Sequence, residues 1–190
     1  MISNSITGYW VTNDKSNYHY NKELCLGIAE FLQKKNLKTV FDFGCGDGSY
    51  IHNLNLLGFQ CLGFDGNPNL EKFTKFAAIK DLSVPSYFQK RDCVISINVG
   101  EYIPKKFESV FIDNICNNTK DSIVISWSSI KDDELKINCQ SIEYLIFEFK
   151  KRGFKLNSTD TYEIKNLSHQ EVIVFDKIKP VNFSRSIEVD

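Results

Sequence analysis

Glycines and carboxylates are concentrated at residues 42–48, which read Asp-Phe-Gly-Cys-Gly-Asp-Gly. This segment overlaps Thr39–Phe43, a β-branched and aromatic run typical of a strand that is covered on both faces. Glycines at alternate positions allow a sharp turn and let a ligand contact the main chain without an intervening Cβ. We therefore expect a strand, a glycine turn and a helix capped by Ser49, whose free N–H groups would favour negatively charged ligand groups.

A second carboxylate, Asp65, ends the next apolar run, roughly 20 positions after the glycine turn. A carboxylate at the end of the second strand is placed to accept hydrogen bonds from the ribose hydroxyls of a nucleoside cofactor. Several nucleoside cofactors share this requirement, so Asp65 alone does not distinguish them. Asp65 also lies in Asp-Gly-Asn-Pro, a sequence that favours a turn, and both interpretations can hold together.

The glycine spacing differs from the dinucleotide fingerprint Gly-x-Gly-x-x-Gly, because an acidic residue precedes the first glycine and the third glycine comes one residue early. The pattern resembles motif I of the class I S-adenosylmethionine (SAM)-dependent methyltransferases. Residues 96–104, 123–127 and 138–141 are also similar to a subgroup of small single-domain methyltransferases, and the resemblance covers roughly residues 18–176. An ordinary glycine-rich turn is the alternative, and the spacing disfavours a nucleotide-dependent oxidoreductase.

The resemblance implies that SAM is the cofactor and that the glycine turn contacts its methionine part. It gives cofactor-binding roles to Asp42, Gly44, Cys45, Gly46, Gly48, Tyr50, Asp65, Gly66, Asn67, Asp81, Leu82 and Asn98. Asp81 would accept a hydrogen bond from the exocyclic amine of adenine while Leu82 covers the ring. The alternative for this pair is a solvated loop carboxylate beside a core leucine.

Related methyltransferases carry Glu-x-x-Glu-His after the fourth strand, where these side chains can bind a divalent cation. Here the corresponding residues are Asn98, Glu101 and Tyr102, a poor ligand set for Mg²⁺ or Zn²⁺, so we expect no required metal. Glu101 remains a candidate general base, or a group that orients an acceptor hydroxyl. A helix-capping or solvated glutamate is the alternative.

Two of the three histidines are further catalytic candidates. His19 precedes the first expected helix, where this fold often closes over SAM, but it could equally belong to a surface aromatic cluster. His169 is expected in a loop between the last two strands, whereas His52 is expected to be structural. Trp127 is more typical of a core than of a pocket wall.

The segment after the fifth strand departs from the subgroup, which often carries Pro-Gly-Gln-Gly-Gly there, ending in His-Val-Asn-Cys. Residues 128–137 are charged and contain neither glycine nor histidine. We expect methyl transfer to a hydroxyl of a small molecule, such as a sugar or another metabolite, because a sulfonium needs mainly alignment with its acceptor. The replaced segment leaves a catalytically inactive SAM-binding subunit as the alternative.

Composition limits the partners and the location that we expect. The chain has 190 residues with a net charge of −1, which gives no broad attraction to nucleic acid or anionic membranes. Its six cysteines form no Cys-x-x-Cys pair and lie mostly in apolar runs, as in a reduced protein. No run approaches about 18 apolar residues, and no basic and apolar leader begins the chain. We expect a cytoplasmic protein; the oligomeric state is not predicted.

Strand and helix patterns alternate along the chain. We expect helices at residues 22–35, 49–57, 68–76, 105–117 and 141–152, and strands at 39–43, 59–65, 77–79, 93–97, 123–127, 154–164 and 171–175. This order predicts a three-layer α/β/α sandwich with a mostly parallel, seven-stranded Rossmann-like methyltransferase sheet and an antiparallel last strand. We expect one domain over residues 1–190, with residues 1–20 as a segment that could close over the cofactor, and ligands beyond the carboxyl ends of the strands.

Overall fold

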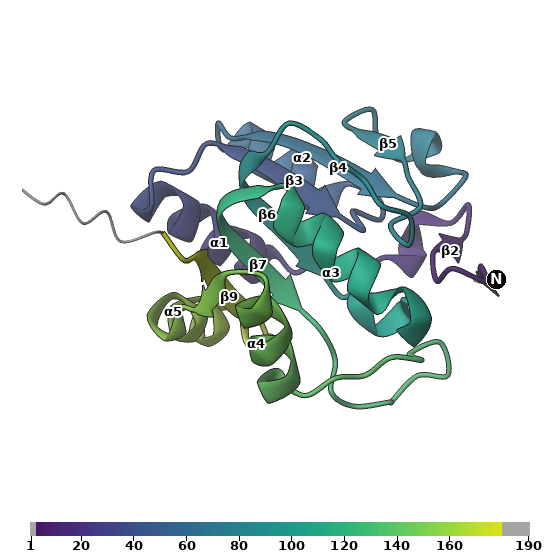
Figure 1. The fold of residues 1–190 in the computed structure, drawn as a ribbon. Coiled ribbons are helices and arrows are strands. Elements are labelled where there is room, and N and C mark those ends of the chain that lie inside the picture. The colour runs from purple at the N-terminus through teal and green to yellow at the C-terminus, as the bar shows by residue number, and fades with distance from the viewer. Residues whose placement is uncertain (1–2, 180–190) are drawn as a thin grey trace, which may run out of the picture.

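A seven-stranded sheet forms the centre of the computed structural model, which describes residues 3–179 (Figure 1). Its strands, in chain order, are β3 (Thr39–Phe43), β4 (Gln60–Asp65), β5 (Ala77–Ile79), β6 (Arg91–Ile97), β7 (Thr119–Ser126), β8 (Phe154–Leu156) and β9 (Ile173–Lys177). They lie side by side in the order β5-β4-β3-β6-β7-β9-β8. β9 pairs antiparallel with both of its neighbours, β7 and β8, and the other pairs in this sheet are parallel. The predicted mostly parallel sheet with an antiparallel last strand is confirmed.

Helices cover both faces of this sheet (Figure 1). One face packs against α1 (Lys22–Lys34), α2 (Ser49–Leu56) and α5 (Ser158–Ser168), and the other against α3 (Glu108–Asn117) and α4 (Ile142–Lys151). Successive side chains of a strand point to opposite faces, so Val40 belongs to the first core and Phe41 to the second. This is the predicted three-layer sandwich. Within residues 3–179, no helix is both long and apolar enough to cross a bilayer.

The prediction of a strand over residues 154–164 is correct only for its first 3 residues. β8 ends at Leu156, and Asn157 then caps α5 by accepting a hydrogen bond from the backbone N–H of Asp160. The buried residues Asp160, Ile164 and Ser168 are four apart and so lie on one face of the helix. This face packs against α1, where Lys34 Nζ lies 2.8 Å from Asp160 Oδ1. Tertiary packing has overridden the strand propensity of the threonine and tyrosine residues.

Two local expectations are also wrong. Ser49 is the first residue of α2 and does not cap it; the Asp47 carboxylate accepts from both the backbone N–H and the hydroxyl of Ser49. Residues 68–76 contain only a 3₁₀ turn, η2 (Leu70–Lys72), instead of the expected helix. Ser49 thus belongs to the helix instead of preceding it, and residues 70–72 form a 3₁₀ turn instead of part of an α-helix.

The first 20 residues contain more structure than their polar, aperiodic sequence suggests. β1 (Ser3–Asn4) and β2 (Trp10–Val11) form a small antiparallel pair, followed by η1 (Lys15–Asn17). Asn67, in the turn after β4, donates from Nδ2 to the Thr12 carbonyl and to the Tyr18 hydroxyl. The segment is therefore tied to the carboxyl edge of the sheet; residues 1 and 2 lie outside the described part of the chain.

The segment between β5 and β6 contains no helix, and two asparagines of the α3 region hold it. Asn114 donates from Nδ2 to the carbonyls of Leu82 and Val84 and accepts from the Ser86 N–H. Asn118, which is fully buried, donates to the Ser86 carbonyl and accepts from the Phe88 N–H. These bonds satisfy buried main-chain groups that would otherwise form part of a strand or helix.

We predict that Asn118→Ala lowers the free energy of unfolding by about 1–3 kcal/mol, because it leaves the Ser86 carbonyl and the Phe88 N–H buried without partners. Urea denaturation of the two proteins measures the loss. Asn117→Ala, on an exposed neighbouring residue, is the control and should change stability little. Equal stability of the two variants would contradict the role given to Asn118.

Candidate cofactor and active site

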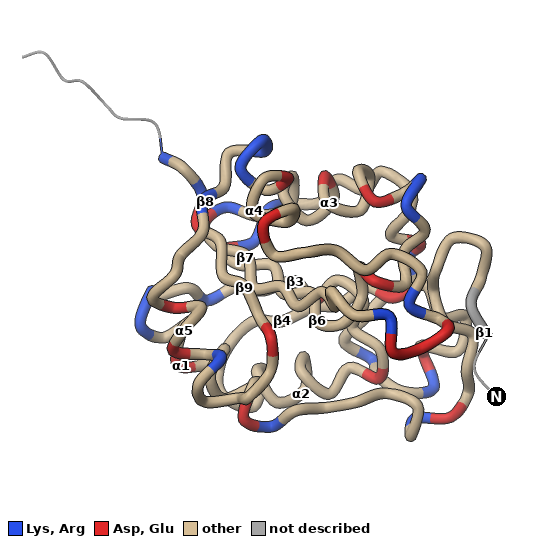
Figure 2. Tube along the Cα trace, turned by 90° about the horizontal axis from the view of Figure 1, so that it is seen from below, with Lys and Arg blue, Asp and Glu red and all other residues tan. Residues whose placement is uncertain are grey.

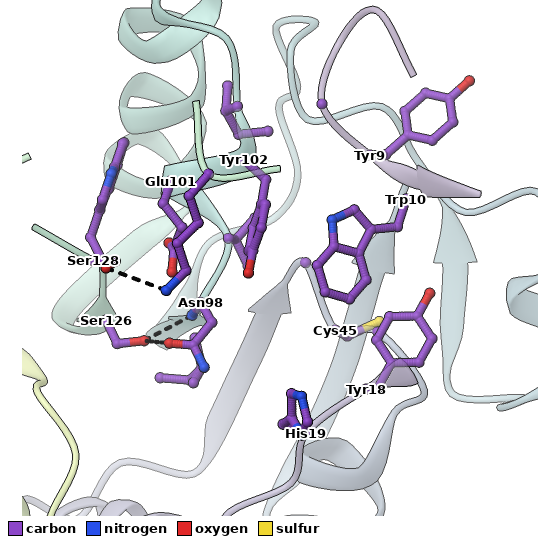
Figure 3. A pocket seen from close by; sticks show the side chains of 18 of the residues that line it. Tyr9, Trp10, Tyr18, His19, Cys45, Asn98, Glu101, Tyr102, Ser126 and Ser128 are labelled. Atoms are coloured by element: carbon purple, nitrogen blue, oxygen red, sulfur yellow. Dashed lines mark hydrogen bonds between the residues drawn. The ribbon is translucent and has the colours of Figure 1, made fainter. Parts of the chain in front are cut away.

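A cavity of about 780 Å³ lies beyond the carboxyl ends of β3, β4, β6 and β7 (Figure 3). Its floor is the turn after β3, and the N-terminal segment forms one wall. The opposite wall comes from the residues after β6 and β7, including η3 (Gly100–Tyr102). Ligand sites of open parallel sheets lie at this edge, so the cavity is where the topology predicts one.

Most residues proposed from the sequence line this cavity. They are Asp42, Gly44, Cys45, Gly46, Tyr50, Asp65, Gly66, Asp81, Leu82 and Asn98 among the cofactor candidates, and Glu101 and His19 among the catalytic ones. Gly48 does not line it: a Cβ there would meet Thr74, 2.7 Å away. Asn67 is fully buried outside it and clamps the N-terminal segment.

His169, the other catalytic candidate, is not among the residues that line the cavity, and its catalytic role stays a prediction. It is an exposed residue that ends α5 in the left-handed region, with φ of 53°. The next two residues, Gln170 and Glu171, are those that reach the cavity. His169 thus ends the helix of residues 158–168 at the surface, one residue before the chain reaches the cavity.

The glycine turn after β3 has two positions that only glycine fits well. Gly44 and Gly46 have φ of 84° and 54°. A Cβ on Gly44 would lie 2.2 Å from the Val99 side chain, and one on Gly46 would lie 2.6 Å from the Tyr18 ring. The turn is therefore in close contact with side chains of both cavity walls, and the contact of a ligand with its main chain stays a prediction.

The Asp65 carboxylate joins this turn to the one after β4. It accepts from the Gly46 N–H at 2.9 Å and from the Asn67 N–H at 2.8 Å. Burial raises the pKa of Asp65 to about 6, against the lowering effect of these two hydrogen bonds. An ionised carboxylate has roughly four acceptor positions, so Asp65 retains acceptor capacity towards the cavity.

Three side-chain polar atoms within residues 3–179 are buried without a hydrogen-bond partner: Asp42 Oδ2, Glu101 Oε2 and Trp10 Nε1. All three residues line the same cavity. An unpaired buried polar group costs about 1–3 kcal/mol. Their coincidence in one cavity indicates a site whose ligand supplies the missing partners.

The two carboxyl groups with an unpaired oxygen, Asp42 and Glu101, both have pKa values raised towards neutrality. Asp42 is 2% exposed, and burial together with the nearby charges of Asp65 and Asp47 raises its pKa to about 8. Glu101 is 1% exposed, and burial raises its pKa to about 7 despite the positive charge of Lys136. A carboxyl group with a pKa near neutrality is suited to moving a proton at physiological pH.

An aromatic wall, formed by Trp10 and Tyr18 of the N-terminal segment and Tyr102 of η3, lines the cavity beside the glycine turn (Figure 3). Trp10 stacks on Tyr18 with ring centroids 5.8 Å apart and meets Tyr102 edge-on at 4.9 Å. This wall was not predicted from the sequence, where its signal is the group of aromatic residues in an otherwise polar N-terminal segment. Trp127 also lines the cavity, although it is mostly buried.

Charged side chains around the cavity are mostly acidic. They are Asp42, Asp47, Asp65, Asp81, Glu101, Asp132, Asp133 and Glu171, against Lys136 and Lys165. Elsewhere, basic and acidic residues occur close together in most parts of the fold (Figure 2). The cavity therefore favours a cationic or neutral ligand over an anionic one. Among residues 3–179, no cluster of His, Cys, Asp and Glu has the grouping needed to hold a metal ion.

The fold and the site define a class I SAM-dependent methyltransferase. Residues 16–126, more than half of the chain, match the model of a family described as a methyltransferase domain, and the chain belongs to this family. Its cofactor is SAM. A search among curated proteins finds no match.

Solved structures with the same fold include magnesium protoporphyrin IX methyltransferase from Synechocystis PCC 6803 with bound SAM. Its identity to this chain is 16%, over 80% of this chain and 77% of that one, with a TM-score of 0.61. A SAM-dependent methyltransferase from Clostridium acetobutylicum is 13% identical over 87% and 94%, with a TM-score of 0.64. The 1,6-didemethyltoxoflavin-N1-methyltransferase of Burkholderia thailandensis is 10% identical over 84% and 80%, with a TM-score of 0.60. At these identities the likeness establishes the fold.

We predict that Asp42→Asn stabilises the protein by about 1–3 kcal/mol at a pH above 8, and by less near pH 5. Between its usual pKa of 3.8 and its folded value of about 8, Asp42 binds a proton in the folded state and not in the unfolded state. Wild-type stability therefore falls as pH rises through this window, whereas asparagine has no such loss. Urea denaturation at both pH values measures the difference, with Asp121→Asn as control. A gain that does not grow with pH would contradict the buried, unpaired state of Asp42.

Proposed function

We propose that this chain transfers the methyl group of SAM to a hydroxyl of a small molecule, with Glu101 as the general base. The observation that carries this proposal is the buried Oε2 of Glu101, which lacks a hydrogen-bond partner on a residue that lines the cavity after β6. A hydroxyl supplies the hydrogen-bond donor that this oxygen needs. The hydroxyl then donates its proton to the same oxygen as it becomes a nucleophile.

The residues at the turns after β3 and β4 fit SAM. The unpaired Asp42 oxygen can accept a hydrogen bond from the ammonium of the methionine part, and Gly44 and Gly46 let that part approach the main chain. Asp65 retains acceptor capacity for the ribose hydroxyls. When bound, SAM supplies a methyl group on a sulfonium, whose carbon–sulfur bond breaks as the acceptor oxygen forms its new bond.

For the adenine, Asp81 and Leu82 are the candidate residues. Asp81 accepts from the Ser83 N–H at Oδ1 and from the Thr7 hydroxyl at Oδ2, which lies 2.8 Å from Thr7 Oγ1. Leu82 is buried beside it and offers an apolar surface to a flat ring. Thr7 links the N-terminal segment to this part of the cavity, which supports the idea that the segment covers the cofactor.

The acceptor side of the cavity favours a neutral molecule with an apolar body. The aromatic wall removes apolar surface from water, and the acidic lining disfavours phosphate or carboxylate groups. Glu101 must be ionised to accept a proton, so its raised pKa places the working range of the site at neutral pH and above. The alternative is a SAM-binding subunit without activity, favoured by the replaced segment 128–137.

Cofactor binding can be tested without the acceptor. We predict that calorimetry detects S-adenosylhomocysteine binding to wild type, and that Asp65→Ala weakens it about 10- to 100-fold through loss of the carboxylate and loosening of both turns. Asp121→Ala, at the opposite end of the sheet strands, should leave the affinity unchanged. Equal affinity in wild type and Asp65→Ala would overturn the placement of the cofactor.

Catalysis is tested by Glu101→Gln, with S-adenosylhomocysteine production measured over a panel of hydroxyl-bearing small molecules. We predict a kcat about 10²- to 10⁴-fold below wild type, because the amide cannot accept the proton, with little change in KM for SAM. Wild-type kcat should rise with pH through about 7, the pKa of Glu101, and the variant should lack this rise. Glu134→Gln, an exposed glutamate of the neighbouring segment, is the control. If the wild-type protein binds the cofactor but methylates no molecule of the panel, the result would favour the inactive SAM-binding subunit.

A further inference from the structure

A polar side-chain cluster, formed by Lys105, Glu108, Asn138, Gln140 and Tyr144, lies behind the cavity and outside its lining. Its centre is Glu108, the first residue of α3, which is 4% exposed. Glu108 accepts hydrogen bonds from all four other members: the Lys105 ammonium, the Asn138 and Gln140 amides and the Tyr144 hydroxyl. A buried carboxylate with so many donors is held in one position.

Asn138 connects this cluster to the candidate active site. Its Nδ2 lies 2.9 Å from Glu108 Oε2, and its Oδ1 accepts from Gln140 Nε2 at 2.6 Å. Its backbone N–H and that of Ile137 both donate to the Glu101 carbonyl, each at 2.9 Å. Its own carbonyl accepts from the Trp127 indole N–H at 2.6 Å. All four polar groups of this residue are therefore paired, two with the cluster and two with the site.

Trp127 fixes the same stretch from the other side. A Cβ on Gly100 would lie 2.2 Å from the Trp127 ring, so the indole rests directly on the main chain of Gly100. The Glu101 backbone is thus held at its carbonyl by residues 137 and 138, and at the preceding residue by an indole that the Asn138 carbonyl orients. Both constraints depend on where Asn138 lies.

The segment that brings Asn138 to this place has no helix or strand between Ser126 and Ile142. Main-chain bonds of residues 137, 138 and 140 hold it locally, and the buried side-chain bond between Asn138 and Glu108 joins it to α3. The same segment carries Lys136 and Asp132, whose charges act on the Glu101 carboxyl. A shift of Asn138 would therefore move the Glu101 backbone and the Trp127 indole that packs beside it. It would also move the charged side chains of the segment that act on the Glu101 carboxyl.

We propose that Glu108 and Asn138 are positioning residues, which hold the Glu101 carboxyl buried at the cavity through the bonds from Asn138 to the Glu101 carbonyl and to the Trp127 indole. Neither residue lines the cavity. The proposal rests on the proposed function for the role of Glu101 as a base. The hydrogen bonds that position Glu101 are present without any ligand. The replaced segment 128–137 is then supported by α3 instead of by glycine turns.

The test is a ¹³C NMR titration of the Glu101 carboxyl in protein labelled at glutamate, with its signal assigned by its absence in Glu101→Gln. In Asn138→Ala the main-chain bonds remain available but the link to Glu108 is lost. We expect the titration midpoint of Glu101 to fall by about one pH unit towards that of an exposed glutamate, because water reaches the carboxyl. Asn166→Ala, on an exposed asparagine of α5, should leave the midpoint unchanged.

Glu108→Gln is the second variant, which keeps the shape of the side chain and removes its charge. We expect a fall in the same direction, with S-adenosylhomocysteine affinity within about twofold of wild type, since neither residue lies at the cofactor turns. Wild-type midpoints for Glu101 in both folded variants would overturn the proposal. The titration needs no turnover. A failure to find methyl transfer would therefore count against the proposed function, whereas the positioning role is decided by the titration midpoints alone.

Discussion

Burial of unpaired carboxylate oxygens in one cavity is the constraint on which the rest of the site depends. Asp42 lies on β3 and Glu101 lies in η3, just after the neighbouring strand β6, and each unpaired oxygen lowers the stability of the fold by an amount that a hydrogen-bond partner would restore. The fold tolerates this because the surrounding groups are fixed independently: Asp65 ties two turns together, and Asn138 holds the main chain beside Glu101. Groups that destabilise the protein alone and gain partners from a ligand are typical of functional sites.

The two sides of the cavity are built in different ways. The proposed cofactor side consists of main-chain turns at the ends of adjacent parallel strands, where glycines allow close packing and one carboxylate bonds to two amides. The proposed acceptor side consists of side chains from the N-terminal segment and from the residues after β6 and β7. Such a division suits a family with one cofactor and varied acceptors, because the acceptor side can change while the turns remain.

The sheet, and the edge at which the cavity lies, could be predicted from the sequence because both follow from local patterns. Strand runs can be read from periodicity, and parallel strands bring their carboxyl ends to one edge, so ligands were expected there, where Asp42, Asp65 and Glu101 line the cavity. The aromatic wall was missed because Trp10 reaches the cavity through contacts with Tyr18 and Tyr102 that no local pattern encodes. The helix before His169 was missed for a related reason: α5 forms through packing on α1, against its strand-like residue types. The clamp role of Asn67 likewise depends on residues about 50 positions away.

The central claim is that the cavity between Asp42 and Glu101 holds the cofactor and presents its methyl group to the acceptor side. A crystal structure with S-adenosylhomocysteine tests this most directly. The account predicts electron density for the ligand over the Gly44–Gly46 turn, with its amino group paired to Asp42, its ribose at Asp65 and its sulfur towards Glu101. Ligand density elsewhere on the molecule, or an Asp42 carboxylate still without a partner in the complex, would contradict it.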